Sequence, residues 1–254
     1  MRKAILALMI LFASVFANAQ VNKEDFFGRM YAKYGGAENL SGKYEINMQM
    51  MGTTMKIPVM FWKKGAKIRM DMAMSQPGMQ KPWEMVMLMD GGKMIQYQKS
   101  LNMVMTADLS KLPESALKQM NQNQFFMFDE NTINNLKNTG SLDNVDVEER
   151  TKAGRNFYLI TIRDIDKIGN VMPAPGGQNT GQIFRKALLW ICGDSLLPEK
   201  MEFYGDADAP GMWIDFQDIK TDTVAESVFN LDIPADAKVM DITEQIKNMA
   251  GSVK

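Results

Sequence analysis

The sequence predicts a mainly β protein: a large curved antiparallel sheet with a helical lid over one face and short N- and C-terminal helices. Residues 43–50 and 67–74 alternate apolar and polar side chains with a period of two, which is typical of half-buried strands. Short turns such as Asp90-Gly91-Gly92 separate consecutive segments and favour antiparallel hairpins. Of the 25 methionines in 254 residues, 17 lie between Met48 and Met127, where many alternate along expected strands.

The N-terminus has the features of a secretory signal. The chain begins Met1-Arg2-Lys3, with two positive residues, and an apolar run follows. Ala17-Asn18-Ala19 forms an A-x-A cleavage site. We expect cleavage near Ala19 and a single domain over residues 20–254, in the periplasm or secreted. The alternative, an uncleaved membrane anchor, is disfavoured because the run is too short to span a bilayer stably.

The remaining elements follow from periodicity and turn residues. Asn22 is expected to cap a first helix that ends at Gly35-Gly36. Pro58 predicts an edge position or a bulge in its strand. Expected strands lie at 43–50, 55–62, 67–74, 83–89, 93–98, 101–106, 145–149, 156–163, 182–192, 199–205 and 212–219. A helical insertion is expected at about 108–138, with a helix over 108–122, and a C-terminal helix over 241–249. Pro and Gly residues predict a mobile loop at about 169–181.

The apolar positions of these strands predict a single lining surface, because residues two apart in a strand share a face. We expect the wall of a hydrophobic cavity to comprise Tyr44, Ile46, Met48, Met50, Ile68, Met70, Met72, Met74, Met201, Phe203, Met212, Ile214 and Phe216. The lid is expected to contribute Leu109, Leu112, Leu117, Met120, Phe125, Phe126 and Phe128. Strand 83–89 is apolar on both faces, so some of its methionines are expected in ordinary core.

Composition argues against catalysis and against several classes of partner. The chain has no histidine, which excludes Ser-His-Asp and Cys-His catalysis and the usual zinc and iron ligand sets. We expect no enzyme activity, no catalytic residues, no cofactor and no bound metal. Without Arg2 and Lys3 the mature chain has 27 bases and 30 acids, a net charge of −3, so nucleic acid is not an expected partner. The single cysteine, Cys192, follows an apolar run and is expected to be buried.

Several short motifs resemble the periplasmic lipoprotein-carrier (LolA-like) superfamily of outer-membrane lipoprotein-sorting proteins, in a methionine-rich branch. They lie at residues 64–70, 90–94 (D-G-G-K-M), 189–191, 197–204 (L-P-E-K-M-E-F-Y) and 229–235 (F-N-L-D-I-P-A). The resemblance implies a half β-barrel with a helical lid over a hydrophobic cavity, and a non-catalytic carrier of acyl chains or lipidated proteins. It also implies transient contact with membrane proteins.

The methionine rows allow three interpretations. They are ordinary core, since methionine fills irregular gaps. They line an adaptable cavity for a lipid, an acyl chain or a lipidated protein. They bind copper(I), for which thioethers are soft ligands. A β-sheet surface that binds a protein partner is a further alternative. The residues favour the lipid cavity, because methionine specifies a core poorly and suits apolar ligands of variable shape.

Overall fold

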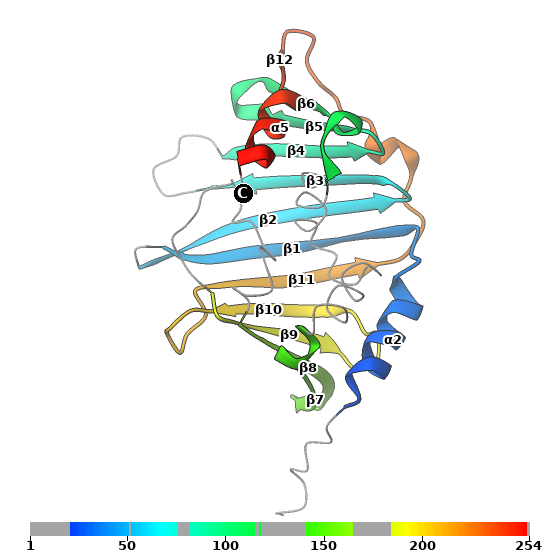
Figure 1. Ribbon diagram of the computed structural model, residues 1–254, viewed down its shortest axis with the longest axis vertical. Coiled ribbons are helices and arrows are strands. Elements are labelled where there is room, and N and C mark those ends of the chain that lie inside the picture. The colour runs from blue at the N-terminus through cyan, green and yellow to red at the C-terminus, as the bar shows by residue number, and fades with distance from the viewer. Residues whose placement is uncertain are drawn as a thin grey trace, which may run out of the picture.

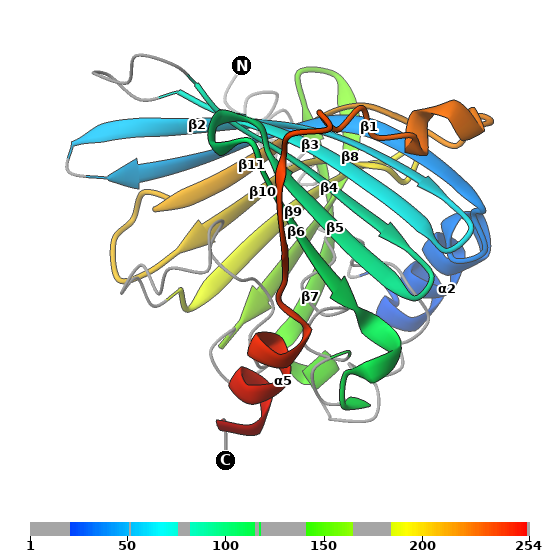
Figure 2. The same cartoon turned by 90° about the horizontal axis from the view of Figure 1, so that it is seen from above.

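The computed structural model describes residues 21–50, 52–75, 82–114, 117, 141–164 and 184–252. These residues form one twelve-stranded sheet in the order β12-β6-β5-β4-β3-β2-β1-β11-β10-β9-β8-β7 (Figure 1). The strands are β1 (Asn39–Met50), β2 (Thr53–Lys64), β3 (Lys67–Met74), β4 (Trp83–Asp90), β5 (Lys93–Gln98), β6 (Met103–Asp108), β7 (Val145–Lys152), β8 (Arg155–Arg163), β9 (Lys186–Cys192), β10 (Pro198–Tyr204), β11 (Met212–Lys220) and β12 (Lys238–Asp241). The predicted fold class is confirmed: the sheet is mainly antiparallel and curved, and it does not close into a barrel (Figure 2).

Two hairpin runs meet in the middle of the sheet. Strands β1 to β6 form one meander and β7 to β11 the other, and antiparallel pairing of β1 with β11 joins them. In the register of that pair Tyr44 lies opposite Phe216 and Ile46 opposite Ile214. One pairing is parallel, that of β12 with β6. It places the C-terminal helix α5 (Thr243–Ser252) beside the far end of the first meander.

Helix α2 (Lys23–Tyr34) begins at the predicted cap, where the Asn22 side chain accepts hydrogen bonds from the backbone N–H groups of Glu24 and Asp25. Its Phe26, Phe27 and Met30 are buried against the sheet. Figure 2 shows α2 and α5 within the curve of the sheet. The face toward these helices is called the concave face below, and the other the convex face.

The two faces carry cores of unequal size. Buried residues of β1, β2, β3, β8, β9, β10 and β11 join those of α2 in one large cluster on the concave face. On the convex face Leu88 packs with Val224 and Phe229 in a small second cluster. Val224 and Phe229 belong to residues 221–237, here called the C-terminal strap, which connects β11 to β12. This second cluster explains why 83–89 is apolar on both faces.

Two local expectations were wrong. Strand β2 is not an edge strand, because β1 and β3 flank it, and its register with β1 is regular through Pro58. The last residue of β2 that pairs with β3 on this side is Val59. Pro58 lies just beyond it, so its missing backbone N–H breaks no hydrogen bond between β2 and β3. A helix does not begin at Asp108 either. A single 3-10 turn, η3 (Leu109–Lys111), is followed by Leu112 in an extended conformation, as expected for a residue before proline.

The other helical expectations lie largely outside the described residues. Leu117 is helical and its N–H donates to the carbonyl of Pro113. Met120, Phe125, Phe126 and Phe128 lie outside the described residues, as do the signal segment and loop 169–181. In the part of the chain that is described, no helix is long and apolar enough to cross a membrane.

Candidate functional site

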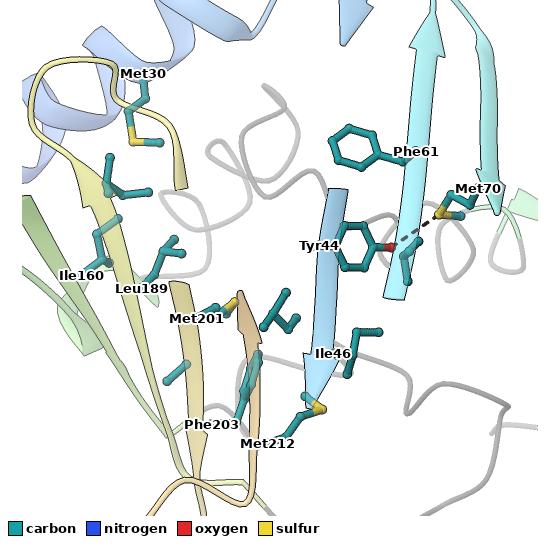
Figure 3. Packing of buried hydrophobic residues seen from close by; sticks show 14 of the residues in the cluster. Met30, Tyr44, Ile46, Phe61, Met70, Ile160, Leu189, Met201, Phe203 and Met212 are labelled. Carbon is teal, nitrogen blue, oxygen red and sulfur yellow. Dashed lines mark hydrogen bonds between the residues drawn. The ribbon is translucent and has the colours of Figure 1, made fainter. Parts of the chain in front are cut away.

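The concave face brings the predicted wall residues together from four strands, β1, β3, β10 and β11. The registers place Tyr44, Ile46 and Met48 opposite Phe216, Ile214 and Met212. They place Met201 and Phe203 opposite Ile214 and Met212, and Met70 and Met72 opposite Phe61 and Val59. Side chains of paired residues lie on the same side of a sheet, so all thirteen predicted wall residues share the concave face. Figure 3 shows several of them, with Phe61, Ile160 and Leu189, converging from neighbouring strands.

Burial is graded along this face. Ile214 is 0% exposed and Met201 1%, whereas Met50 is 45% exposed. Partly exposed methionines gather at one end of the sheet, where β1 turns into β2, β3 ends and β4 begins; this methionine rim comprises Met50, Met55, Met72, Met74 and Met85. The rim is thus an accessible apolar margin of an otherwise buried surface.

Methionine is concentrated on one side of the sheet. Strand registers place the following on the concave face: Met48, Met50, Met55, Met70, Met72, Met74, Met85, Met87, Met89, Met94, Met103, Met105, Met201, Met212 and Met240. Met60 lies on the convex face, paired with Asp71. Met70 lies directly opposite Met87, Met72 opposite Met85, and Met89 opposite Met94.

Sequence reasoning missed part of this surface. Phe61 in β2, Leu189 in β9 and Ile160 in β8 are 2–3% exposed and belong to the same cluster. The alternation Ile57, Val59, Phe61 was visible, but only the pairing of β2 with β1 and β3 assigns these residues to the concave face. The polar Gln96 and Gln98 also lie on the concave face, opposite Met87 and Met85.

Charge is kept off the buried part of the concave face. Among the described residues, the buried polar side chains are Asn47 and Thr243, and Asn47 lies on the convex face, opposite Trp213. The convex face instead carries ion pairs, such as Lys56–Glu45 at 2.9 Å and Lys200–Glu202 at 2.9 Å. An apolar molecule on the concave face would therefore contact neither a buried charge nor a desolvated ion pair.

Two hydrogen-bond donors approach methionine sulfur atoms on the concave face. The hydroxyl of Tyr44 donates to Sδ of Met70 at 3.7 Å, as Figure 3 shows by a dashed line. Burial raises the pKa of the Tyr44 hydroxyl, so it stays protonated and acts as a donor. The side-chain amide of Gln96 donates to Sδ of Met85.

The described residues offer no conventional metal centre: no group of three or more Asp, Glu, Cys or His side chains is arranged to hold an ion. Cys192 lies on the convex face and is half-buried, so the expectation of a buried thiol was wrong. Burial raises the pKa of this thiol, but hydrogen bonds from Ser195, the Asp194 backbone and Arg155 outweigh burial and lower it. The thiol is turned toward Arg155 because residues alternate sides along β9.

Comparison with known proteins finds similarity at the level of structure only. No protein-family model matches the chain, and no curated protein matches its sequence. Among solved structures, an uncharacterized conserved protein from Thermus thermophilus matches with a TM-score of 0.50 and 10% identity, over 86% of this chain and 98% of that one. The LolA superfamily protein NE2245 from Nitrosomonas europaea matches with a TM-score of 0.33 and 11% identity, over 84% and 99%.

A putative outer membrane lipoprotein-sorting protein domain from Vibrio parahaemolyticus also matches, with a TM-score of 0.37 and 12% identity, over 81% of this chain and 95% of that one. Proteins of the superfamily that the sequence motifs resemble are thus among the matching structures. These matches show a likeness of fold alone, since the identities are 10–12%, and what the concave face binds has to be argued from its own side chains.

Proposed function

We propose that this protein is a non-catalytic carrier that binds a lipid, an acyl chain or the lipid moiety of a lipidated protein on its methionine-rich concave face. The observation that carries the proposal is the contiguous apolar surface spread over β1, β3, β10 and β11, whose buried side chains include no charge. A surface of this kind recognises an apolar tail by burial and leaves a charged headgroup to solvent.

Burial provides the driving force for binding. Each methylene removed from water contributes about 0.8 kcal/mol, so ten methylenes contribute on the order of 8 kcal/mol before the costs of association. A net free energy of about 8 kcal/mol corresponds to a micromolar Kd, so a tail of ten methylenes binds more weakly than that and a longer tail binds more tightly. Methionine suits a carrier, because its flexible thioether side chain adapts to ligands of variable shape.

The methionine rim gives the ligand an entry route. Met50, Met74 and Met85 are apolar yet partly exposed at one end of the sheet. The deeper residues Met201 and Ile214 would contact the far part of a chain that enters there. With the expected signal segment removed near Ala19, the carrier would work in the periplasm, or outside the cell, between a donor and an acceptor membrane component.

Adjacent residues of β3 provide a matched test. Met74 lies on the concave face and Ala73 on the convex face, and both are partly buried. The mature protein is analysed by native mass spectrometry for co-purified lipid and titrated with the fluorescent fatty acid 11-(dansylamino)undecanoic acid. Met74→Lys is expected to weaken binding about tenfold or more, because it sets a charge against the apolar tail. Ala73→Lys is expected to leave Kd within about twofold, since surface changes have small effects. The proposal would be refuted if the mature protein bound neither lipid nor probe. It would also be refuted if both variants lost affinity for the probe to the same extent.

A copper(I) site is a second candidate, favoured by one observation. Met70, Met72, Met85 and Met87 form two directly opposed pairs on neighbouring strands, so four soft thioethers lie close together. Titration of copper(I) against the chelator bicinchoninate measures this directly. Withdrawal of copper from the chelator by the wild type, and not by a Met70→Leu/Met85→Leu variant, would support the site. No withdrawal at micromolar protein would eliminate it.

A further inference from the structure

The sulfur atoms of Met70 and Met85 have an unusual setting for an apolar surface, because each faces a hydrogen-bond donor, the Tyr44 hydroxyl and the Gln96 amide respectively. A thioether sulfur is only a weak acceptor. A sulfoxide oxygen on the same sulfur is a far stronger acceptor, and it would lie within reach of the same donor. The concave face therefore already contains partners for the oxidised form of these two methionines.

Access to oxidant differs between the two positions. Met85 belongs to the partly exposed methionine rim. Met70 is 8% exposed and lies in β3 two residues before the rim residue Met72, farther from the end of the sheet. A small soluble oxidant entering at the rim thus meets Met85 before it meets Met70. The single cysteine of the chain lies on the convex face, so no thiol competes for that oxidant on the concave face.

We propose that Met85, followed by Met70, is a site of reversible oxidation to methionine sulfoxide by peroxide, and that this oxidation releases the apolar ligand from the concave face. The release rests on the proposed carrier function. In the forward step the sulfur lone pair attacks one oxygen of hydrogen peroxide, the O–O bond breaks and an S–O bond forms. The other oxygen leaves as water, sulfur loses two electrons and the peroxide gains them. In the reverse step a methionine sulfoxide reductase removes the oxygen as water while two thiols become a disulfide.

Oxidation changes the wall where the ligand would lie. Met85 and Met72 are directly opposed, so one sulfoxide at Met85 places a polar group within the rim. Sulfoxide formation turns a flexible apolar side chain into a polar one. One donor satisfies only part of the hydrogen-bonding capacity of a sulfoxide oxygen, so an apolar tail beside it removes the water that serves the rest. Two such groups are expected to weaken binding about tenfold or more.

The experiment uses the mature protein, 11-(dansylamino)undecanoic acid as probe and hydrogen peroxide as oxidant. Peptide mass spectrometry follows oxidation at Met85, Met70 and the control Met60, which is 43% exposed on the convex face. The expected result is a Kd that rises about tenfold as Met85 and Met70 oxidise, and that returns after treatment with methionine sulfoxide reductase and dithiothreitol. In a Met70→Leu/Met85→Leu variant, whatever its own Kd for the probe before treatment, peroxide is expected to change that Kd by less than about twofold, whereas Met60→Leu is expected to show the same rise as wild type.

A second variant tests the donor itself. Gln96→Leu removes the partner of the Met85 sulfoxide, so oxidation is expected to lower its Tm more than it lowers the Tm of wild type. Unchanged probe binding with Met85 and Met70 fully oxidised would overturn the inference and leave the carrier function standing. The inference would also be overturned if peroxide weakened probe binding by the Met70→Leu/Met85→Leu variant as much as by wild type, while circular dichroism showed that the variant stayed folded. No binding by the untreated protein would instead refute the carrier function, and ligand release with it.

Discussion

Arg69 fastens the C-terminal strap to the convex face, and its replacement gives the sharpest stability prediction. Its guanidinium donates from Nε and Nη2 to the two carboxylate oxygens of Asp71, at 2.7 Å each, and from Nη1 to the carbonyl of Val228 at 2.6 Å. It also lies over the ring of Trp62, 5.6 Å from the centroid. One side chain thus ties β3 to the strap that leads to β12 and α5.

The expected cost of Arg69→Met follows from these contacts. Hydrogen bonds to charged groups contribute about 1.5–3 kcal/mol each but are not additive, and the contact with Trp62 adds about 0.5–1 kcal/mol. The side chains of Arg69 and Asp71 are 20% and 21% exposed, so solvent screens the pair only in part. With Asp71 left without its partner, we expect the free energy of unfolding to fall by about 2–4 kcal/mol.

Urea denaturation followed by circular dichroism measures the change, with Lys43→Met as the control. Lys43 pairs with Asp218 at 3.9 Å, with side chains 57% and 67% exposed, and such surface pairs contribute about 0–1 kcal/mol. A double variant, Arg69→Met/Asp71→Asn, is expected to recover part of the loss because no unpaired carboxylate remains. If Arg69→Met costs no more than the control, the argument that Arg69 anchors the strap is refuted.

Two further predictions concern a close approach at Gly42 and the acid-sensitive hydrogen bonds between Thr243 and Asp241. A Cβ at Gly42 would lie 2.6 Å from Cδ1 and 3.1 Å from Cα of Ile219, so Gly42→Ala is expected to cost about 1–3 kcal/mol in urea denaturation. Gly36→Ala, where a Cβ meets nothing within 4 Å, is the control, and an equal cost in both would contradict the steric explanation. Hydrogen bonds from the Thr243 hydroxyl and backbone lower the pKa of Asp241. Its stabilising effect is therefore present above the unfolded-state pKa of about 3.9 and is lost as pH falls through the lower folded-state pKa. The Tm difference between wild type and Asp241→Asn is expected to shrink between pH 6 and pH 2.5, and a difference independent of pH would contradict the assignment.

Much of the fold could be predicted because its signals are local. Asn22 caps α2 as predicted, and Gly91, with a φ of 57°, lies in the turn between β4 and β5. The strands over 67–74 and 93–98 were predicted with the bounds that they have in the structure. The start of the expected helix at Asp108 was wrong because the effect of Pro113 on Leu112 outweighed the apolar periodicity.

The residues of the concave face were predicted in part, because only those assigned by a local pattern could be recognised. Alternation within β1 and β3 assigned their methionines to one face, and that assignment holds. Phe61, Leu189 and Ile160 were missed because no local pattern states which strand lies beside which. The partial exposure of Cys192 was also missed, since an apolar run does not reveal which face of β9 is covered by other residues.

By itself, the sequence determined most of the strands, though not β12, and which side chains share a face within each of them, because a strand's two-residue period is a property of its own backbone. The tertiary structure alone decided that β1 pairs with β11 and that β12 joins β6 in parallel. It also decided that Met70 faces Tyr44. These contacts depend on register between segments distant in the chain, which is set by the packing of the whole concave face.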